Sequence, residues 1–251
     1  MDFCNKKIKN KRVAILGPAD YVNKELDDNH GEFINKFDTV IRLNSMLKLP
    51  NKELEKYYGT KFDILVTGFW PFNDHPQFIE GHLNKSRYLH IDNYKDISHN
   101  LLVFDFSTET YYKEYIYNKN KTFFDKNKHI SFFSFPFNLL QKLAKKFNIE
   151  RSPTTGLVAV LLCILSNAKE IYVSGVTFYS DKKHNGYYDS YDMMSEKSRK
   201  NINKNKKFMF DGKQYRYLPA GHNYYDEAKI FKKLCKKYNI HTDKYLKTLI
   251  E

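Results

Sequence analysis

Residues 151–179 read RSPTTGLVAVLLCILSNAKEIYVSGVTFY and contain a turn, a helix and a strand in direct succession. Residues 152–156 combine small hydroxyl residues with proline and glycine, a composition typical of a turn. Residues 157–165 are apolar without a break, which predicts a helix that is buried on all sides. Residues 170–176 predict a strand. A hydroxyl-rich turn is therefore expected at the N-terminus of a buried helix.

Two interpretations of this turn are open. The first N–H groups of a helix lack intrahelical partners, and the helix dipole favours an anion there. Gly156 has no Cβ, so a ligand could approach its backbone closely. The alternative is a simple N-cap by Thr154 or Thr155, since threonine is a common capping residue. The spacing alone does not decide between a ligand site and a cap.

Strand patterns alternate with helix patterns along most of the chain. Further strands are expected at residues 12–16, 38–43, 62–66, 87–91, 101–106 and 130–133, and helical segments within 22–37, 137–147 and 224–238. This alternation predicts one α/β domain over residues 1–251, Rossmann-like, with a mainly parallel sheet flanked by helices. The loops that begin at Gly17, Asn44, Gly68 and Tyr179 all follow predicted strands. They should therefore share one edge of the sheet, where such folds bind ligands.

Residues 180–221 interrupt the alternation and are rich in lysine, asparagine, serine and tyrosine. A segment of this length inside a compact domain is typical of a lid over a site. A solvated basic loop explains the same composition equally well.

The formal net charge of +13 on 251 residues implies an acidic partner. A nucleotide, a nucleic acid, an anionic glycolipid and a membrane surface all qualify. The three cysteines have neither disulfide nor zinc-site spacing, which favours a reducing, cytoplasmic compartment. No apolar run approaches the ~18 residues of a membrane span, and residues 1–11 lack the apolar core of a signal peptide. Any membrane contact is therefore expected to be peripheral.

His222 is the histidine that the pattern singles out, because it directly precedes a predicted helix and follows the turn at residues 219–221. The positive end of a helix disfavours the imidazolium, so His222 should be neutral and able to accept a proton. A structural or exposed histidine is the alternative.

The sequence contains no D-x-D pair, no phosphate-binding P-loop and no G-x-G-x-x-G. A leaving phosphate would then be stabilised by hydroxyls, backbone amides and basic side chains, with no metal ion and no cofactor. Tyr179, Tyr187 and Tyr188 are candidates for that role, against the alternative that they only pack.

Taken in order, four segments resemble the motifs of two sialyltransferase families. These are the bacterial lipooligosaccharide sialyltransferases (glycosyltransferase family 42) and the animal-type sialyl-motif enzymes (glycosyltransferase family 29). Residues 12–44, with Gly17 and DTVIRLN, resemble the large motif, and residues 153–175 the small motif. GYYD at 186–189 is similar to the short aromatic motif, and His222 with Glu227 resembles the very-small motif. KEIYVSGVTFY at 169–179 is especially similar to the bacterial family.

The resemblance implies a GT-A-like fold and an inverting, metal-independent transfer of sialic acid from CMP-sialic acid to a hydroxyl of a glycan or glycolipid. Such an enzyme would serve lipooligosaccharide or capsule synthesis. His222 would be the general base. Tyr179 with Tyr187 or Tyr188 would donate hydrogen bonds to the departing phosphate, and the segment 180–221 would close over the donor. The donor-binding residues implied are Gly17, Asn44, Thr154, Thr155 and Gly156.

The chain departs from these families at Pro18, where both usually have asparagine, and Asp20 is the candidate replacement. A CMP-Kdo transferase is therefore the nearest rival in the same class. A basic nucleotide- or nucleic-acid-binding protein without catalysis is the rival in another class. Dispersed basic residues and the lack of an aromatic-rich strand motif disfavour nucleic acid.

Overall fold

The computed structural model describes most of the predicted sheet and the helices against it. The described residues are 6–44, 46, 52–67, 102–105, 125, 128–134, 142, 145–147, 153–178, 207–210, 213–216 and 224–251.

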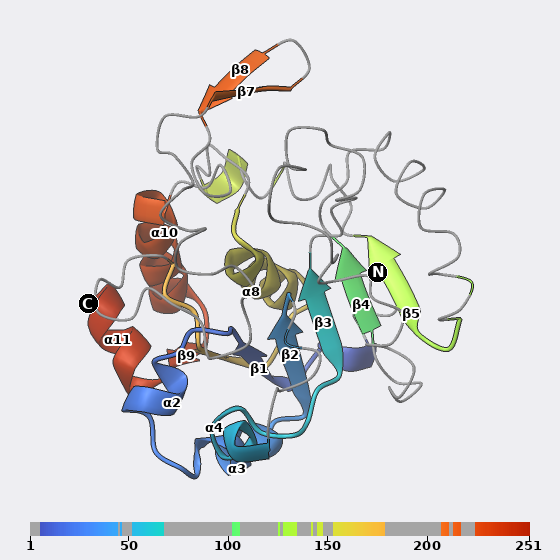
Figure 1. Ribbon diagram of the computed structural model, residues 1–251, viewed down its shortest axis with the longest axis vertical. Coiled ribbons are helices and arrows are strands. Elements are labelled where there is room, and N and C mark those ends of the chain that lie inside the picture. The colour runs from blue at the N-terminus through green and yellow to red at the C-terminus, as the bar shows by residue number, and fades with distance from the viewer. Residues whose placement is uncertain are drawn as a thin grey trace.

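One seven-stranded sheet forms the centre of the fold, and every neighbouring pair of its strands is parallel. In spatial order the strands are β5 (Ser131–Ser134), β4 (Leu102–Asp105), β3 (Ile64–Thr67), β2 (Thr39–Leu43), β1 (Arg12–Leu16), β6 (Glu170–Ser174) and β9 (Ile240–Thr242). Because the strands are all parallel, their carboxyl ends lie along one edge of the sheet, the edge to which the arrows of β2 and β3 point in Figure 1. The predicted α/β, Rossmann-like fold is confirmed.

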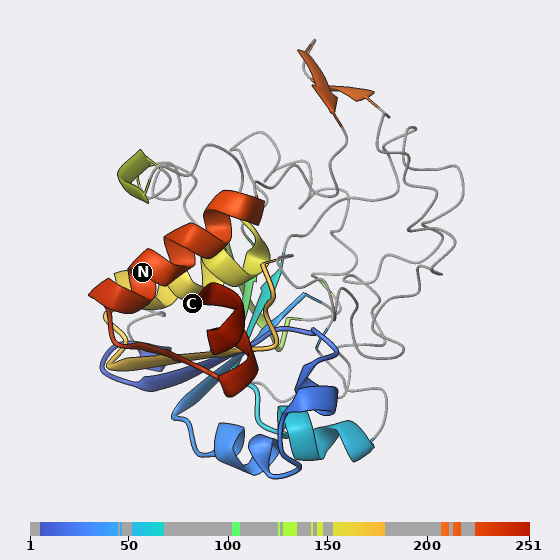
Figure 2. The same cartoon turned by 90° about the vertical axis from the view of Figure 1, so that its left-hand side faces the viewer.

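Helices cover both faces of the sheet. They are α2 (Val22–Glu25), α3 (His30–Asn35), η1 (Lys52–Leu54), α4 (Glu55–Tyr58), α8 (Thr155–Leu165), α10 (Tyr224–Lys237) and α11 (Lys244–Ile250). Figure 2 shows α8 and α10 on one face and α2, α3 and α4 on the other. The fold is therefore a three-layer α/β/α arrangement. The all-apolar helix is buried as predicted, since every residue of α8 from Gly156 to Cys163 is buried.

Several predicted elements were found with shifted ends, and others were missed. The strand predicted to reach residue 176 ends at Ser174, where Gly175 turns the chain with a φ of 70°. The sequence did not predict β9, α11 or the antiparallel hairpin of β7 (Lys207–Phe210) and β8 (Lys213–Arg216). That hairpin lies within the segment predicted as a lid. The rest of that segment, the strand at 87–91 and most of the helix at 137–147 fall outside the described residues.

Two glycines bring the loops after β1 and β6 into backbone contact. The Gly17 N–H donates to the Ser174 carbonyl at 2.8 Å, and Ala19 N–H donates to the Gly175 carbonyl at 3.0 Å. A Cβ on Gly17 would lie 2.1 Å from the Gly175 carbonyl oxygen, and a Cβ on Gly175 would lie equally close to that of Gly17. No side chain fits in that space, so glycine at both positions fixes the edge of the sheet beside β1 and β6.

A buried tyrosine ties this glycine pair to α11. The Gly175 N–H donates to the Tyr21 hydroxyl oxygen at 2.7 Å, and the same hydroxyl donates to Asp243 Oδ2 at 2.8 Å. Asp243 Oδ1 accepts the Leu246 N–H at 2.7 Å, which caps α11. Burial and the neighbouring Asp243 carboxylate raise the pKa of Tyr21 well above its usual value, so its proton stays in place to make this bond.

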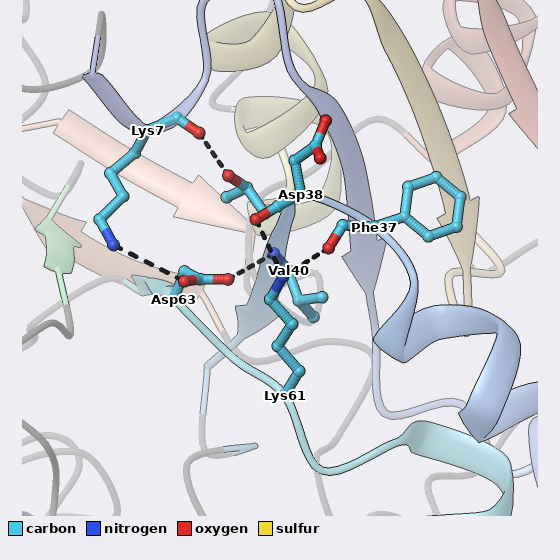
Figure 3. Close-up of polar contacts among 7 residues, drawn as sticks. Lys7, Phe37, Asp38, Val40, Lys61 and Asp63 are labelled. Carbon is cyan, nitrogen blue, oxygen red and sulfur yellow. Dashed lines mark hydrogen bonds and ion pairs between the residues drawn. The ribbon is translucent and has the colours of Figure 1, made fainter.

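The opposite ends of β2 and β3 are held by lysines and carboxylates (Figure 3). Asp63 accepts the Val40 N–H at 3.0 Å and pairs with Lys7 at 3.6 Å. Lys61 Nζ donates to the carbonyl oxygens of Phe37 at 2.5 Å and Asp38 at 2.9 Å. These contacts satisfy polar groups at the amino edge, so that edge is structural.

No helix among the described residues combines the length and apolarity that crossing a membrane requires.

Candidate functional site

Thr154 is the residue that begins helix α8. Its backbone is extended, with φ −63° and ψ 158°, and its Oγ1 accepts the Leu157 N–H at 3.3 Å. Its carbonyl oxygen accepts the Val158 N–H at 2.9 Å. Of the two threonines that the sequence offered as caps, Thr154 is therefore the N-cap.

Glu227, on the first turns of α10, binds the same threonine with both carboxylate oxygens. Its Oε1 accepts the Thr154 N–H at 2.8 Å, and its Oε2 accepts the Thr154 hydroxyl at 2.6 Å. The Glu227 side chain belongs to a residue only 1% exposed. The start of α10 is therefore fixed against the start of α8, although the two residues are 73 positions apart.

Burial raises the pKa of Glu227 to about 7, and the two hydrogen bonds from Thr154 only partly oppose the rise. The carboxylate occupies the positive end of α8, which the sequence had offered to a ligand anion. An anionic ligand at this helix end would thus meet a group whose charge changes near neutral pH.

Asn44, at the end of β2, is the second residue that reaches the start of α8. Its Oδ1 accepts the Thr155 hydroxyl at 3.0 Å across 111 positions of sequence. Its backbone has a φ of 54°, a left-handed conformation that asparagine tolerates better than most residues, and its N–H donates to the Val66 carbonyl at 2.9 Å. With Oδ1 engaged, the Asn44 amide NH₂ is the group that can donate to a ligand.

Gly156 and Gly17 both lie against Val176. A Cβ on Gly156 would approach Val176 Cγ1 at 2.9 Å, and a Cβ on Gly17 would approach Val176 Cγ2 at 2.8 Å. Val176 therefore occupies the space that the sequence analysis left for a ligand beside Gly156. Both glycines have a packing function here, and their contact with a donor stays a prediction.

Phe178 fixes the segment that leads to Tyr179. It is 2% exposed, has a φ of 46°, and its ring lies 4.7 Å from that of Phe231 on α10. The segment after β6 is therefore packed against the same helix that carries Glu227.

The five predicted donor residues lie together at one end of α8. Thr154, Thr155 and Gly156 form its first turn, Asn44 bonds to it, and Gly17 meets it through Val176. The predicted catalytic residues His222, Tyr179, Tyr187 and Tyr188 fall outside the described residues. Asp20, suggested as a donor contact, has its Oδ2 2.6 Å from Lys24 Nζ.

Sequence reasoning missed two features of this site. Val176 was assigned to a strand and carried no signal of its position between two glycines. Glu227 was assigned to the first turn of the last helix and to a motif, and a lone carboxylate does not indicate which distant N–H it will accept. The sequence could have indicated Asp243, because aspartate is a common N-cap residue and Asp243 directly precedes helix α11.

The site presents hydroxyl and amide groups around a helix N-terminus. The Thr154 and Leu157 N–H groups are occupied, which leaves those of Thr155 and Gly156 as the first-turn donors for a ligand. Such a set suits a ligand rich in acceptor oxygens, of which a nucleotide phosphate is one.

A comparison with solved structures finds a mammalian sialyltransferase, crystallised with Gal-beta-1-3GalNAc-ortho-nitrophenol. The match has a TM-score of 0.50 and 15% identity, and it covers 96% of this chain and 71% of that chain. At this identity the likeness shows the fold. No family model matches the chain, and no curated protein matches it.

The packing of Gly156 can be separated from any contact with a ligand. We expect Gly156→Ala to lower the free energy of unfolding by about 1–3 kcal/mol, because the new methyl overlaps Val176. Adding Val176→Ala should recover much of this loss, and Val176→Ala alone is the control. Chemical denaturation measures all three variants. A double variant no more stable than Gly156→Ala would show that Val176 is not the obstacle.

The charge of Glu227 should make stability depend on pH. The unfolded chain ionises this carboxyl near its ordinary value of 4.5, but the folded chain does so only near 7. Its contribution to stability is thus present below about pH 4.5 and lost as the pH rises through 7. Over that interval the wild type should lose on the order of 3 kcal/mol more than Glu227→Gln, measured by urea denaturation.

The difference between the pH profiles of the wild type and Glu227→Gln removes the contribution of other titrating groups. One of these is buried His30, whose pKa is lowered by burial. Glu53→Gln, on the exposed turn η1, is the matched control and should keep the wild-type pH dependence. Parallel pH profiles for the wild type and Glu227→Gln would show that Glu227 does not titrate in this range.

Proposed function

We propose that this chain is an inverting, metal-independent glycosyltransferase that moves sialic acid from CMP-sialic acid to a hydroxyl of a glycan acceptor. The observation that carries the proposal is the double hydrogen bond between Glu227 and Thr154. It joins the segment that resembles the very-small motif to the one that resembles the small motif.

A second hydrogen bond supports the same proposal. Asn44 ends the segment that resembles the large motif, and its side chain accepts the hydroxyl of Thr155. Three motifs that are far apart in sequence thus meet at one helix N-terminus.

In the proposed reaction Thr155, Asn44 and the first-turn amides of α8 bind the cytidylate. The Asn44 amide, which the Thr155 hydroxyl orients, donates to acceptor oxygens, and the helix dipole adds a favourable field. Glu227 does not touch the substrate in this scheme: it holds the start of α10 in place. A protonated Glu227 leaves the field of α8 intact for a phosphate, so donor binding should strengthen as Glu227 becomes neutral.

His222 is the proposed general base. Two steps of the chain join it to Tyr224, where α10 begins, and these span at most about 7 Å. The Glu227 contact places that helix start near the site. His222 takes the proton of the attacking hydroxyl as the bond from the anomeric carbon to CMP breaks. Tyr179 with Tyr187 or Tyr188 donates to the departing phosphate, and residues 180–221 exclude water.

A CMP-Kdo transferase would use the same cytidylate site. It is the nearest alternative, because the chain has Pro18 where both sialyltransferase families usually have asparagine. Calorimetry tests the nucleotide first. We expect CMP to bind more tightly than other nucleoside monophosphates, with an affinity unchanged by EDTA. Transfer assays with CMP-sialic acid and CMP-Kdo then identify the sugar. Strongly salt-dependent oligonucleotide binding without a CMP signal would instead support the nucleic-acid alternative.

Thr155→Val should weaken CMP binding by about 5- to 30-fold, because it removes the hydrogen bond that orients the Asn44 amide. Calorimetry measures the affinity. Thr248→Val is the matched control, because the hydroxyl of Thr248 bonds within α11, to the Tyr245 carbonyl. An unchanged CMP affinity in Thr155→Val would limit Thr155 to a structural function.

His222→Ala should lose about 100-fold or more of the transfer rate and keep its CMP affinity, because a general base acts on the acceptor. Steady-state transfer assays and calorimetry measure the two quantities. His241→Ala is the control, since His241 is exposed and bonds to Asn239. Normal turnover of His222→Ala would remove the assigned role.

A further inference from the structure

Helix α10 carries five lysines on the side opposite the core: Lys229, Lys232, Lys233, Lys236 and Lys237. At 3.6 residues per turn they fall within an arc of about 140°. Ile230, Phe231 and Leu234 lie on the opposite arc and enter the core. Residues 229–238 contain no acidic residue. From Lys229 to Lys237 the outer face of α10, which faces the viewer in Figure 2, is therefore rich in positive charge.

Backbone contacts at the end of α10 extend this positive face to the amino edge of the sheet. The Asn239 side chain donates to the Lys169 carbonyl at 2.9 Å, and the Lys169 N–H donates to the Lys11 carbonyl at 2.9 Å. The lysines at these positions are exposed. We call the following set the basic surface: Lys9, Lys11, Lys169, Lys233, Lys236 and Lys237.

Among the described residues, no carboxylate forms an ion pair with the lysines of this surface. Some lysines beside other helices are paired, as Lys24 is with Asp20 at 2.6 Å and Lys56 with Asp28 at 3.1 Å. A row of unpaired exposed cations on one face is suited to a polyanionic partner.

We propose that the basic surface docks the protein on an anionic lipid membrane. Lysine ammonium groups on flexible stems attract a diffuse layer of headgroups without needing fixed partners. A single-stranded nucleic acid would be favoured by exposed aromatic side chains for stacking. The exposed large apolar side chains among the described residues are Phe33 and Phe133, and neither lies on α10.

Docking through α10 also has a consequence for the candidate site. The first turn of α10 is bonded to the start of α8 at the carboxyl edge of the sheet, whereas the basic surface lies at the last turns of α10 and the amino edge. A docked protein would therefore hold the candidate site at the edge of the sheet away from the basic surface.

Co-sedimentation with vesicles of phosphatidylcholine containing about one-third phosphatidylglycerol tests the proposal. The test variant is Lys233→Glu with Lys236→Glu. The control is Lys36→Glu with Lys52→Glu, two exposed lysines on the opposite layer. Each substitution changes the charge by two units, so both doubles carry +9 in place of +13.

We expect wild-type binding that falls as salt is added and is absent with pure phosphatidylcholine. The test double should lose binding by at least about 25-fold, about fivefold for each lysine removed. The control double should bind nearly as the wild type does. Calorimetry with CMP should give the same affinity for all three proteins, which shows that the fold and the site are intact.

Three results would overturn the proposal: no wild-type binding to the anionic vesicles, equal losses in both doubles, or binding to a single-stranded oligonucleotide alone. The vesicle assay is independent of catalysis. Lysine-dependent vesicle binding by a protein that transfers no sialic acid would refute the proposed function and leave the basic surface as a membrane site.

Discussion

The buried carboxylate of Glu227 bonds twice to Thr154, and the arrangement of the candidate site depends on that contact. Removing a carboxylate from water is costly unless its oxygens are hydrogen-bonded, so this group needs both of Thr154's donors. The contact has two effects: it gives the Thr154 N–H at the start of α8 a hydrogen-bond acceptor, and it fixes the start of α10 against α8. Without it, α8 and α10 would be held by apolar packing alone, which does not specify how their first turns meet.

The parallel sheet provides the frame for this contact. Gly17 and Gly175 let two strand ends touch through their backbones, and Tyr21 links that pair to Asp243 at the start of α11. The loops after β1, β2 and β6 are thereby brought beside the first turn of α8. Glycine is required at both positions because the neighbouring carbonyl oxygens leave no space for a methyl group. The rigidity of this edge comes from backbone contact, and side chains such as Asn44 are then free to meet a ligand.

The site combines a positive helix end with a carboxylate that titrates near neutral pH. Two negative groups compete for the field of α8: Glu227 and any phosphate that binds there. Protonation of Glu227 would relieve the competition, and its ionisation would weaken the helix end as an anion site. In the proposed reaction, donor binding and helix capping would thus be coupled through one proton. The charge of the whole chain, +13, attracts anions in general, but this local balance governs what α8 itself can bind.

The sequence by itself determined the alternation of strands and helices up to β6, the buried helix at α8 and the class of fold, but not β9, α11 or the hairpin of β7 and β8. Apolar runs and turn residues are local signals, and parallel strands with helices between them allow few arrangements. It also placed Asn44, Thr154 and Thr155 among the candidates. Only the tertiary structure decided which threonine caps α8, that Val176 fills the space beside Gly156, and that Glu227 reaches Thr154. Those choices depend on hydrogen bonds and packing between residues 20 to 111 positions apart, and no local pattern records which distant partner a polar or small residue will meet.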